Sequence, residues 1–234
     1  MSAQAIAEEL SKLGKDSYKK VLFNHGIREP LIGVSIEEMK KVQRRVKKDY
    51  QLALDLYDTG VYDLMYLAGL IADDLRMTKD DLRSWLAKAY CGALSDITVA
   101  WVAAESLHGW ELGLEWIESP VDKTAAAGWS TLGSLVGIKD DSELDLPALE
   151  KLIQRVESTI HDQPNCVRYT MNGFLIAVGT YVQSLTDRAI QAAEKIGTVK
   201  VELTGSCKVP SAPDYIRKSQ QRGTIGKKRK SAKC

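Results

Sequence analysis

Four runs of apolar and small residues recur along this chain and limit the folds that it can adopt. Each run follows a more polar stretch with helical periodicity, and their starts are separated by 33, 28 and 45 residues. The runs are LAGLIAD (67–73), AWVAAES (100–106), GWSTLGSLV (128–136) and GFLIAVGTYV (173–182). Helical hairpins of HEAT or armadillo type, with a period of about 40–47 residues, stack such inner helices into one continuous core. The pattern therefore predicts an all-α solenoid with a concave binding face.

The segment 90–106 is the most enclosed of the expected helices. Positions 97–104 are apolar on every side, which is typical of a helix surrounded by neighbours. Asp96 is a lone carboxylate at the start of this run. Either Ser95 caps the helix and Asp96 merely favours its dipole, or Asp96 faces a cleft and takes part in chemistry. Both interpretations stay open on the sequence alone.

Other elements show clear local signals. Ser35 and Glu38 have capping-box spacing ahead of an amphipathic helix, and Asn165 is placed to cap the helix that follows it. Only TVKVEL (198–203) alternates in the manner of a strand. Because a single run of this kind cannot form a sheet, we expect at most one short strand near 198–203.

The composition indicates an ordinary globular protein, with 44% hydrophobic and 27% charged residues. No apolar run approaches the roughly 18 residues that span a bilayer, and the first ten residues lack the basic start of a signal peptide. We therefore expect a cytoplasmic protein without membrane contact. The four cysteines and three histidines lack metal-ligand spacing, so we expect neither a metal site nor a cofactor.

The small net charge of +1 conceals a strong asymmetry. Eight of the 32 lysines and arginines lie after residue 216 and none of the 31 acids does, so residues 1–216 carry −7 and residues 217–234 carry +8. This favours a single solenoid domain over 1–216 and a basic tail over 217–234. Such a tail is expected to seek a polyanion, although a solvated end that aids solubility is an equal alternative.

Basic residues elsewhere form two further candidate DNA contacts. One is on the helix after Ser35, where a solvated basic face is the alternative explanation. The other is the pair Arg168 and Asn172, which lie one helical turn apart and could equally bond to each other on a helix surface. Together with the tail, the candidate DNA-binding residues are Lys40, Lys41, Arg44, Arg168, Asn172, Lys227, Lys228, Arg229 and Lys230.

Several stretches resemble the bacterial DNA alkylation repair proteins related to the AlkD-type glycosylases, which are built from HEAT-like repeats. They include HGIREPLIGVSIEEMKKVQRRVKK, YDLMYLAGLIADD, WVAAESLHG, AGWSTLGSLV, VRYTMNGFLIAVGTYV, SCKVP and GKKRK. The resemblance covers nearly the whole chain. It implies binding of alkylated duplex DNA, and excision of cationic N3- or N7-methylated purines by stabilising an oxocarbenium-like sugar.

The resemblance also implies where catalysis would occur. Active members carry a tryptophan, an acid directly after it and a second acid three residues further on. Here Ser95, Asp96 and Val99 fall at those places, so only Asp96 retains an acid. If this protein excises bases, Asp96 supplies the carboxylate, and Trp129 or Tyr90 offers an aromatic face to the cationic sugar. The alternatives are a non-catalytic DNA-binding protein and a scaffold that binds a protein partner on its concave face.

Overall fold

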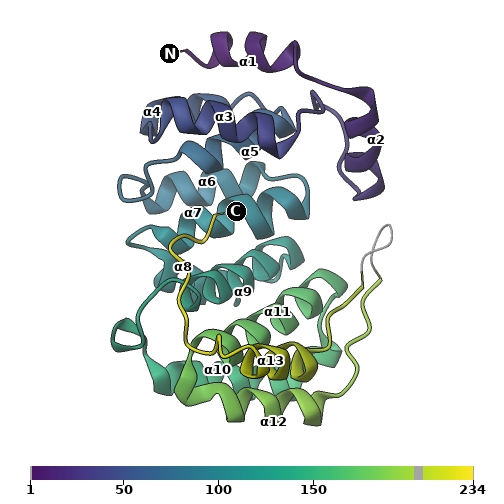
Figure 1. Cartoon of the computed structure of the whole chain (residues 1–234), viewed down its shortest axis with the longest axis vertical. Coiled ribbons are helices and arrows are strands. Elements are labelled where there is room, and N and C mark those ends of the chain that lie inside the picture. The colour runs from purple at the N-terminus through teal and green to yellow at the C-terminus, as the bar shows by residue number, and fades with distance from the viewer. Residues whose placement is uncertain (1, 203–207, 234) are drawn as a thin grey trace.

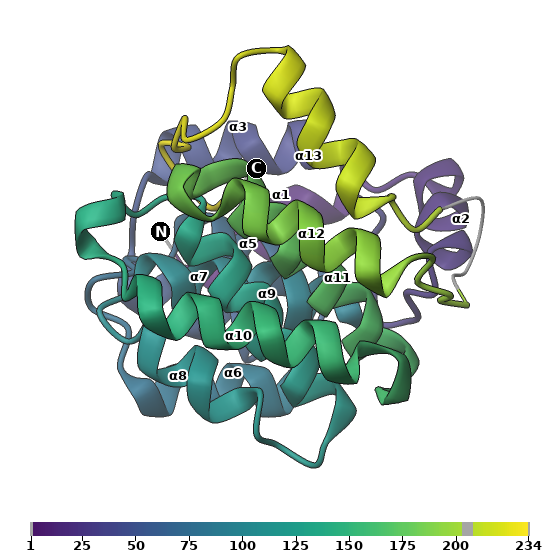
Figure 2. The ribbon, with the colours of Figure 1, turned by 90° about the horizontal axis from the view of Figure 1, so that it is seen from below.

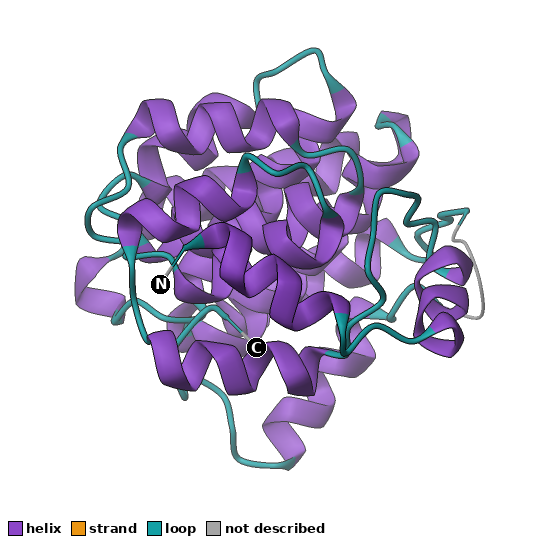
Figure 3. Ribbon diagram, turned by 90° about the horizontal axis from the view of Figure 1, so that it is seen from above, coloured by secondary structure: helices purple, strands orange, loops and turns teal. Residues whose placement is uncertain are grey.

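The computed structural model describes residues 2–202 and 208–233, and that part of the chain contains helices and no β-strand (Figure 3). The helices stack in layers along the long axis of the molecule, with the N-terminal helices at one end and the C-terminal ones at the other (Figure 1). This confirms the predicted all-α solenoid.

A central stack of helices forms the middle of the molecule. It consists of α5 (Tyr62–Ile71), the continuous pair η1 (Ala93–Val99) and α7 (Ala100–Glu105), α9 (Asp122–Val136) and α11 (Asn165–Tyr181). These are the four small-residue runs of the sequence. Each packs directly on the next one in the series.

The remaining helices cover this stack. One side is covered by α4 (Tyr50–Tyr57), α6 (Lys79–Lys88), α8 (Gly109–Trp116), α10 (Leu146–Thr159) and α12 (Thr186–Ile196). At the N-terminal end lie α1 (Ala3–Ser11), α2 (Asp16–Asn24) and α3 (Ile36–Val46), and α13 (Ala212–Gln221) packs on α11 and α12. Viewed from below, α3 and α13 lie on the same side of the molecule (Figure 2). We call this side the α3/α13 face.

Glycine lets the covering helix α8 approach the central helix α9 closely. A Cβ at Gly128 in α9 would lie 2.7 Å from the backbone nitrogen of Ile117 and 3.0 Å from the carbonyl oxygen of Gly113. Both neighbours are backbone atoms, so they cannot move aside as a flexible side chain could. The small residues of the sequence therefore set the spacing between α8 and α9.

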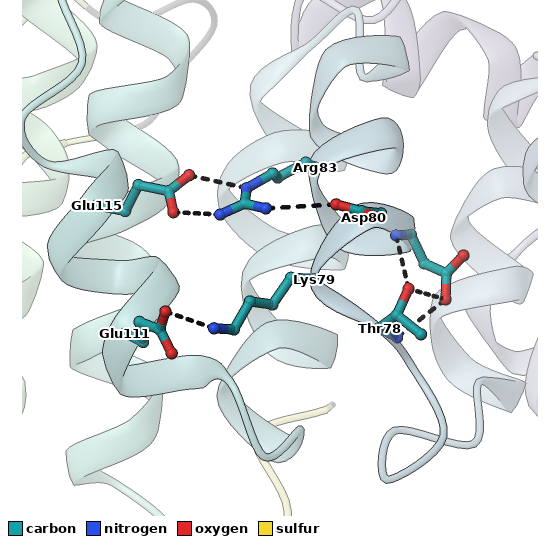
Figure 4. A network of polar contacts seen from close by, with 7 residues as sticks. Thr78, Lys79, Asp80, Arg83, Glu111 and Glu115 are labelled. Carbon is teal, nitrogen blue, oxygen red and sulfur yellow. Dashed lines mark hydrogen bonds and ion pairs between the residues drawn. The ribbon is translucent and has the colours of Figure 1, made fainter.

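Ion pairs join successive covering helices on their exposed side. Arg83 of α6 reaches Glu115 of α8 at 2.6 Å, and Lys79 reaches Glu111 at 2.5 Å (Figure 4). Arg188 of α12 likewise reaches Glu150 of α10 at 2.7 Å. Exposed pairs of this kind contribute little stability each, typically about 0–1 kcal/mol. They do, however, leave these cations occupied by neighbouring acids.

Two local expectations were wrong. Ser95 is not a cap, because the helix begins at Ala93 with a π-helical turn and Ser95 lies inside it. Asn165 is the first helical residue, and its side chain instead bonds the backbone nitrogen and oxygen of Glu202, at 2.8 and 2.6 Å. Residues 198–202 are irregular, which agrees with the expectation of at most one short strand there, while position 203 lies outside the described residues. Ser35 also caps α3 as predicted, its Oγ accepting from the Glu38 nitrogen.

Candidate nucleic-acid interface

The C-terminal segment, residues 222–233, runs along the α3/α13 face past the ends of the central helices (Figure 1). The nitrogen of Gly226 donates to the Thr180 oxygen of α11 at 2.9 Å, and the nitrogen of Arg229 donates to the Gly137 oxygen after α9 at 2.8 Å. Further on, the nitrogen of Ala232 donates to Glu105 of α7 at 2.7 Å. The segment thus visits the C-terminal ends of three central helices in turn.

Helix C-termini attract cations because their last carbonyl groups lack helical partners and carry partial negative charge. The Lys228 ammonium donates to the Val136 oxygen at 2.9 Å and lies 2.8 Å from Asp141. Lys233 reaches the buried carboxylate of Asp74 at 2.6 Å. Part of the positive charge of the tail is therefore used within the protein.

Position 216, the expected end of the solenoid domain, lies inside α13.

The other candidate cations of the tail face solvent. Lys227, Arg229 and Lys230 are exposed, and the Arg229 guanidinium lies 5.6 Å from the centre of the Tyr181 ring. These three residues flank the point where the segment crosses the ends of α11 and α9. They are available to a polyanion, whereas Lys228 is held by Asp141.

The basic residues of α3 lie further along the same face, beside the end of the C-terminal segment. Arg44 is exposed and, with Lys47 and Lys48, lines an open cleft of about 410 Å³ that Lys233 closes from the other side. Lys40 is half-buried on the same helix. A cleft bordered by several cations suits the phosphates of a nucleic acid.

Lys41 differs from its basic neighbours on α3. It is exposed, but its ammonium donates to Glu38 at 2.6 Å, a bond that raises the pKa of Lys41. A surface pair of this kind exchanges readily with solvent and with other anions. Lys41 therefore remains a weaker candidate for phosphate contact than Arg44.

The predicted pair in α11 is not assembled for DNA contact. Asn172 is buried, and its side-chain nitrogen donates to the Pro210 oxygen at 3.0 Å. Arg168 is half-buried in the wall of a small cleft formed with residues 199–202, and its Nε has no partner among the described residues. Asn172 therefore holds the loop before α13, and only Arg168 keeps an unused donor.

Asp96 lies in the π-helical turn and is largely removed from water. Burial raises the pKa of Asp96 to about 6, against the opposing influence of a hydrogen bond from Ser95 and the positive charge of Lys123. The Ser95 hydroxyl donates to the Asp96 carboxylate at 2.6 Å. The hydrogen-bond partner of the Asp96 carboxylate is thus the adjacent serine. Val99, at the place of the family's second acid, is fully buried in the core.

The two aromatic candidates are engaged elsewhere. Tyr90 is 41% exposed and its hydroxyl donates to the Pro30 oxygen at 3.2 Å, while burial of the ring raises its pKa. Trp129 is 1% exposed, packs edge-on against Phe174 at 5.1 Å, and has the Arg155 guanidinium 5.7 Å from its ring centre. These contacts give each ring a structural role.

Comparison with known proteins places these features in a family. The model of a family described as DNA alkylation repair enzyme matches residues 5–212. The chain belongs to this family. Proteins similar to this chain include the uncharacterized protein Lin0241 of Listeria innocua and the uncharacterized protein Lmo0209 of Listeria monocytogenes. The first is 34% and the second 33% identical, each match covering 92% of this chain and 95% of the relative.

A solved structure shares the entire fold. It is described as "a new family of proteins related to the HEAT-like repeat DNA glycosylases with affinity for branched DNA structures". The two chains cover each other completely, with a TM-score of 0.93 and 34% sequence identity. The chain therefore has the HEAT-like fold of DNA-binding proteins.

Two other site expectations concern metals and membranes. Among residues 2–202 and 208–233, no group of three or more His, Cys, Asp or Glu side chains is placed to hold a metal ion. No helix in the same residues is both long and apolar enough to cross a bilayer.

Sequence reasoning missed Glu105 and Asp74, which anchor the tail, because their partners lie more than a hundred residues away.

Proposed function

We propose that this protein binds branched DNA through the α3/α13 face and does not excise bases. The similar structure is described as having affinity for branched DNA, and its fold and length match this chain throughout. The observation that carries the proposal here is the placement of two exposed basic groups on one face. One group is Arg44, in α3, with Lys47, which follows the helix. The other is Lys227, Arg229 and Lys230 of the C-terminal segment.

The two basic groups follow one another along the α3/α13 face. The C-terminal segment that carries the second group passes the ends of α11 and α9, and its Ser231 and Lys233 line the same cleft as Arg44 and Lys47. A single duplex arm can be held by either group through its phosphates, a contact that is independent of base sequence. A branched molecule offers two arms that diverge from one point, so both groups can bind at once. Two linked contacts bind more tightly than either alone because the second becomes intramolecular.

The environment of Asp96 supports the absence of catalysis. Stabilising an oxocarbenium-like sugar needs an ionised carboxylate next to the reacting bond. The Asp96 carboxylate already accepts a hydrogen bond from Ser95, and the second acid of the family pattern is replaced by the buried Val99. The aromatic rings of Tyr90 and Trp129 have other partners.

Base excision and junction binding can be tested in one preparation. The protein is incubated with methylated duplex DNA and the solution is analysed for free 3-methyladenine and 7-methylguanine, while gel shift monitors binding of a four-way junction. We expect retained junction binding and no released base. Release that Asp96→Asn abolishes would contradict the proposal and restore Asp96 as the catalytic carboxylate.

A further inference from the structure

A cleft on the α3/α13 face is lined by aromatic rings. It has a volume of about 250 Å³ and lies along α9 and α11, where α13 and the C-terminal segment border it. Gly133 and Gly173 are among the residues that line it. The rings that line it are Trp129, Tyr169, Phe174, Tyr181 and Tyr215.

Two of these rings are freely accessible. Tyr169 of α11 is 41% exposed and Tyr215 of α13 is 52% exposed. Both are among the few large hydrophobic side chains that the described surface leaves in water. Since the rings come from different helices that pack together, the cleft presents aromatic faces held in place by the fold.

One residue that lines this cleft carries a buried polar atom without a partner. Thr180 is 6% exposed, and its hydroxyl has no hydrogen-bond partner among the described residues. Burying a hydroxyl without a partner is unfavourable, by about 1–3 kcal/mol in mutational data. Ser130 and Ser134 add two further hydroxyl groups to the lining. The cleft therefore suits a flat ligand that has apolar faces and polar edges.

Positive charge stands at one end of the cleft. Arg229 lines it, and Lys227 and Lys230 are exposed beside Arg229 in the chain. A ligand that carries phosphate next to its flat group would satisfy both parts of the site. A nucleotide has this chemistry, because its base stacks on aromatic rings and its phosphate pairs with arginine or lysine.

We propose that this cleft holds one unpaired nucleobase at the branch point of the bound DNA. The inference rests on the proposed function, since branched DNA is the ligand that brings unstacked bases to this face. The base stacks on Tyr169 and Tyr215, its edge bonds Thr180, and the phosphate beside it contacts Arg229. Duplex arms, whose bases stay stacked, bind outside the cleft.

The test compares two three-way junctions, one fully paired and one with two unpaired thymidines at the branch. Wild type is expected to bind the second more tightly. Tyr215→Ala and Tyr169→Ala should each reduce that affinity by roughly 5- to 100-fold and leave duplex affinity unchanged. Tyr215→Phe should retain wild-type affinity because it keeps the ring. Tyr90→Ala removes an exposed tyrosine outside the cleft and serves as the matched control.

A fluorescent base gives an independent readout. With 2-aminopurine at the unpaired position, stacking should quench its fluorescence in wild type and in Tyr215→Phe, but not in Tyr215→Ala. Junction preference that survives both alanine substitutions, or equal losses for duplex and junction, would overturn the inference. Wild type that binds no junction better than duplex would instead overturn the proposed function.

Discussion

Lys233 and Asp74 form an ion pair at 2.6 Å between the last described residue and the loop after α5. Both side chains are buried, at 7% and 1% exposure, and Lys48 bonds the second carboxylate oxygen at 3.0 Å. The pair fixes the end of the C-terminal segment beside the basic residues of α3. It therefore links the two groups of cations that we assign to DNA binding.

Replacing Lys233 by methionine should destabilise the protein, because Asp74 would stay buried with Lys48 as its remaining cation. The expected loss is about 1–3 kcal/mol in the free energy of unfolding, measured by urea denaturation. Lys230→Met, at an exposed position of the same segment, should change it by less than about 0.5 kcal/mol. Equal effects of the two substitutions would show that the segment is not held by this ion pair.

Exposed cations of α3 and the residue after it should control the salt dependence of binding. Replacing Arg44 and Lys47 together by glutamine removes two phosphate contacts, so the slope of log K against log salt should fall by roughly 2 units. Titrations of junction DNA at several salt concentrations measure this slope. Arg83→Gln removes a cation already paired with Glu115 on the covering helices and should leave the slope unchanged. A slope that changes with Arg83→Gln instead would mean that DNA binds the covering helices and not the α3/α13 face.

Asp96→Asn should stabilise the protein at neutral pH. Folding raises the pKa of Asp96 from 3.8 to about 6. The protonated carboxyl therefore contributes its full stabilisation of the folded state below about pH 4, and this contribution is lost as the pH rises through 6. The neutral amide avoids that loss, and the gain should reach about 1–3 kcal/mol at pH 7.5 and be smaller at pH 4.5. Unfolding curves at the two pH values provide the measurement. Destabilisation of the same size at both would contradict this account, because asparagine keeps the shape of the side chain and removes its charge.

Much of the fold could be predicted because its signals are local. The Ser35 cap and the small-residue runs depend on neighbours within one or two helical turns, and both appear as expected. The π-helical turn at Ser95 could not be predicted, because helical periodicity does not distinguish it from an α-helix. The alternating run at 198–202 stays irregular since, among the described residues, it finds no strand to pair with.

The candidate site was only partly predictable, because it depends on contacts across the fold. The sequence marked Lys227 to Lys230 as one basic group, yet Lys228 turns to Asp141 while its neighbours face solvent. Asn172 had the right spacing for a partner of Arg168, but its side-chain amide donates instead to the Pro210 oxygen of the loop before α13. Such outcomes depend on residues that are distant in sequence.

Two helical glycines should respond oppositely to alanine. Gly128→Ala should destabilise the protein by about 1–3 kcal/mol, because the new methyl group meets backbone of α8 and of the residue after it. Gly173→Ala should stabilise it by about 0.5–1 kcal/mol, since nothing lies within 4 Å of a Cβ there and alanine favours a helix. Thermal unfolding of both variants beside wild type measures the difference. Matching shifts in the two variants would contradict the close packing of α8 on α9.

The central claim, preference for branched DNA, is tested most directly by fluorescence anisotropy. A four-way junction and a linear duplex of equal phosphate number are titrated with the protein at one fixed salt concentration, so that bulk charge cancels. Our account predicts a dissociation constant at least about tenfold lower for the junction, because both basic groups bind it at once. Equal dissociation constants for junction and duplex would contradict it.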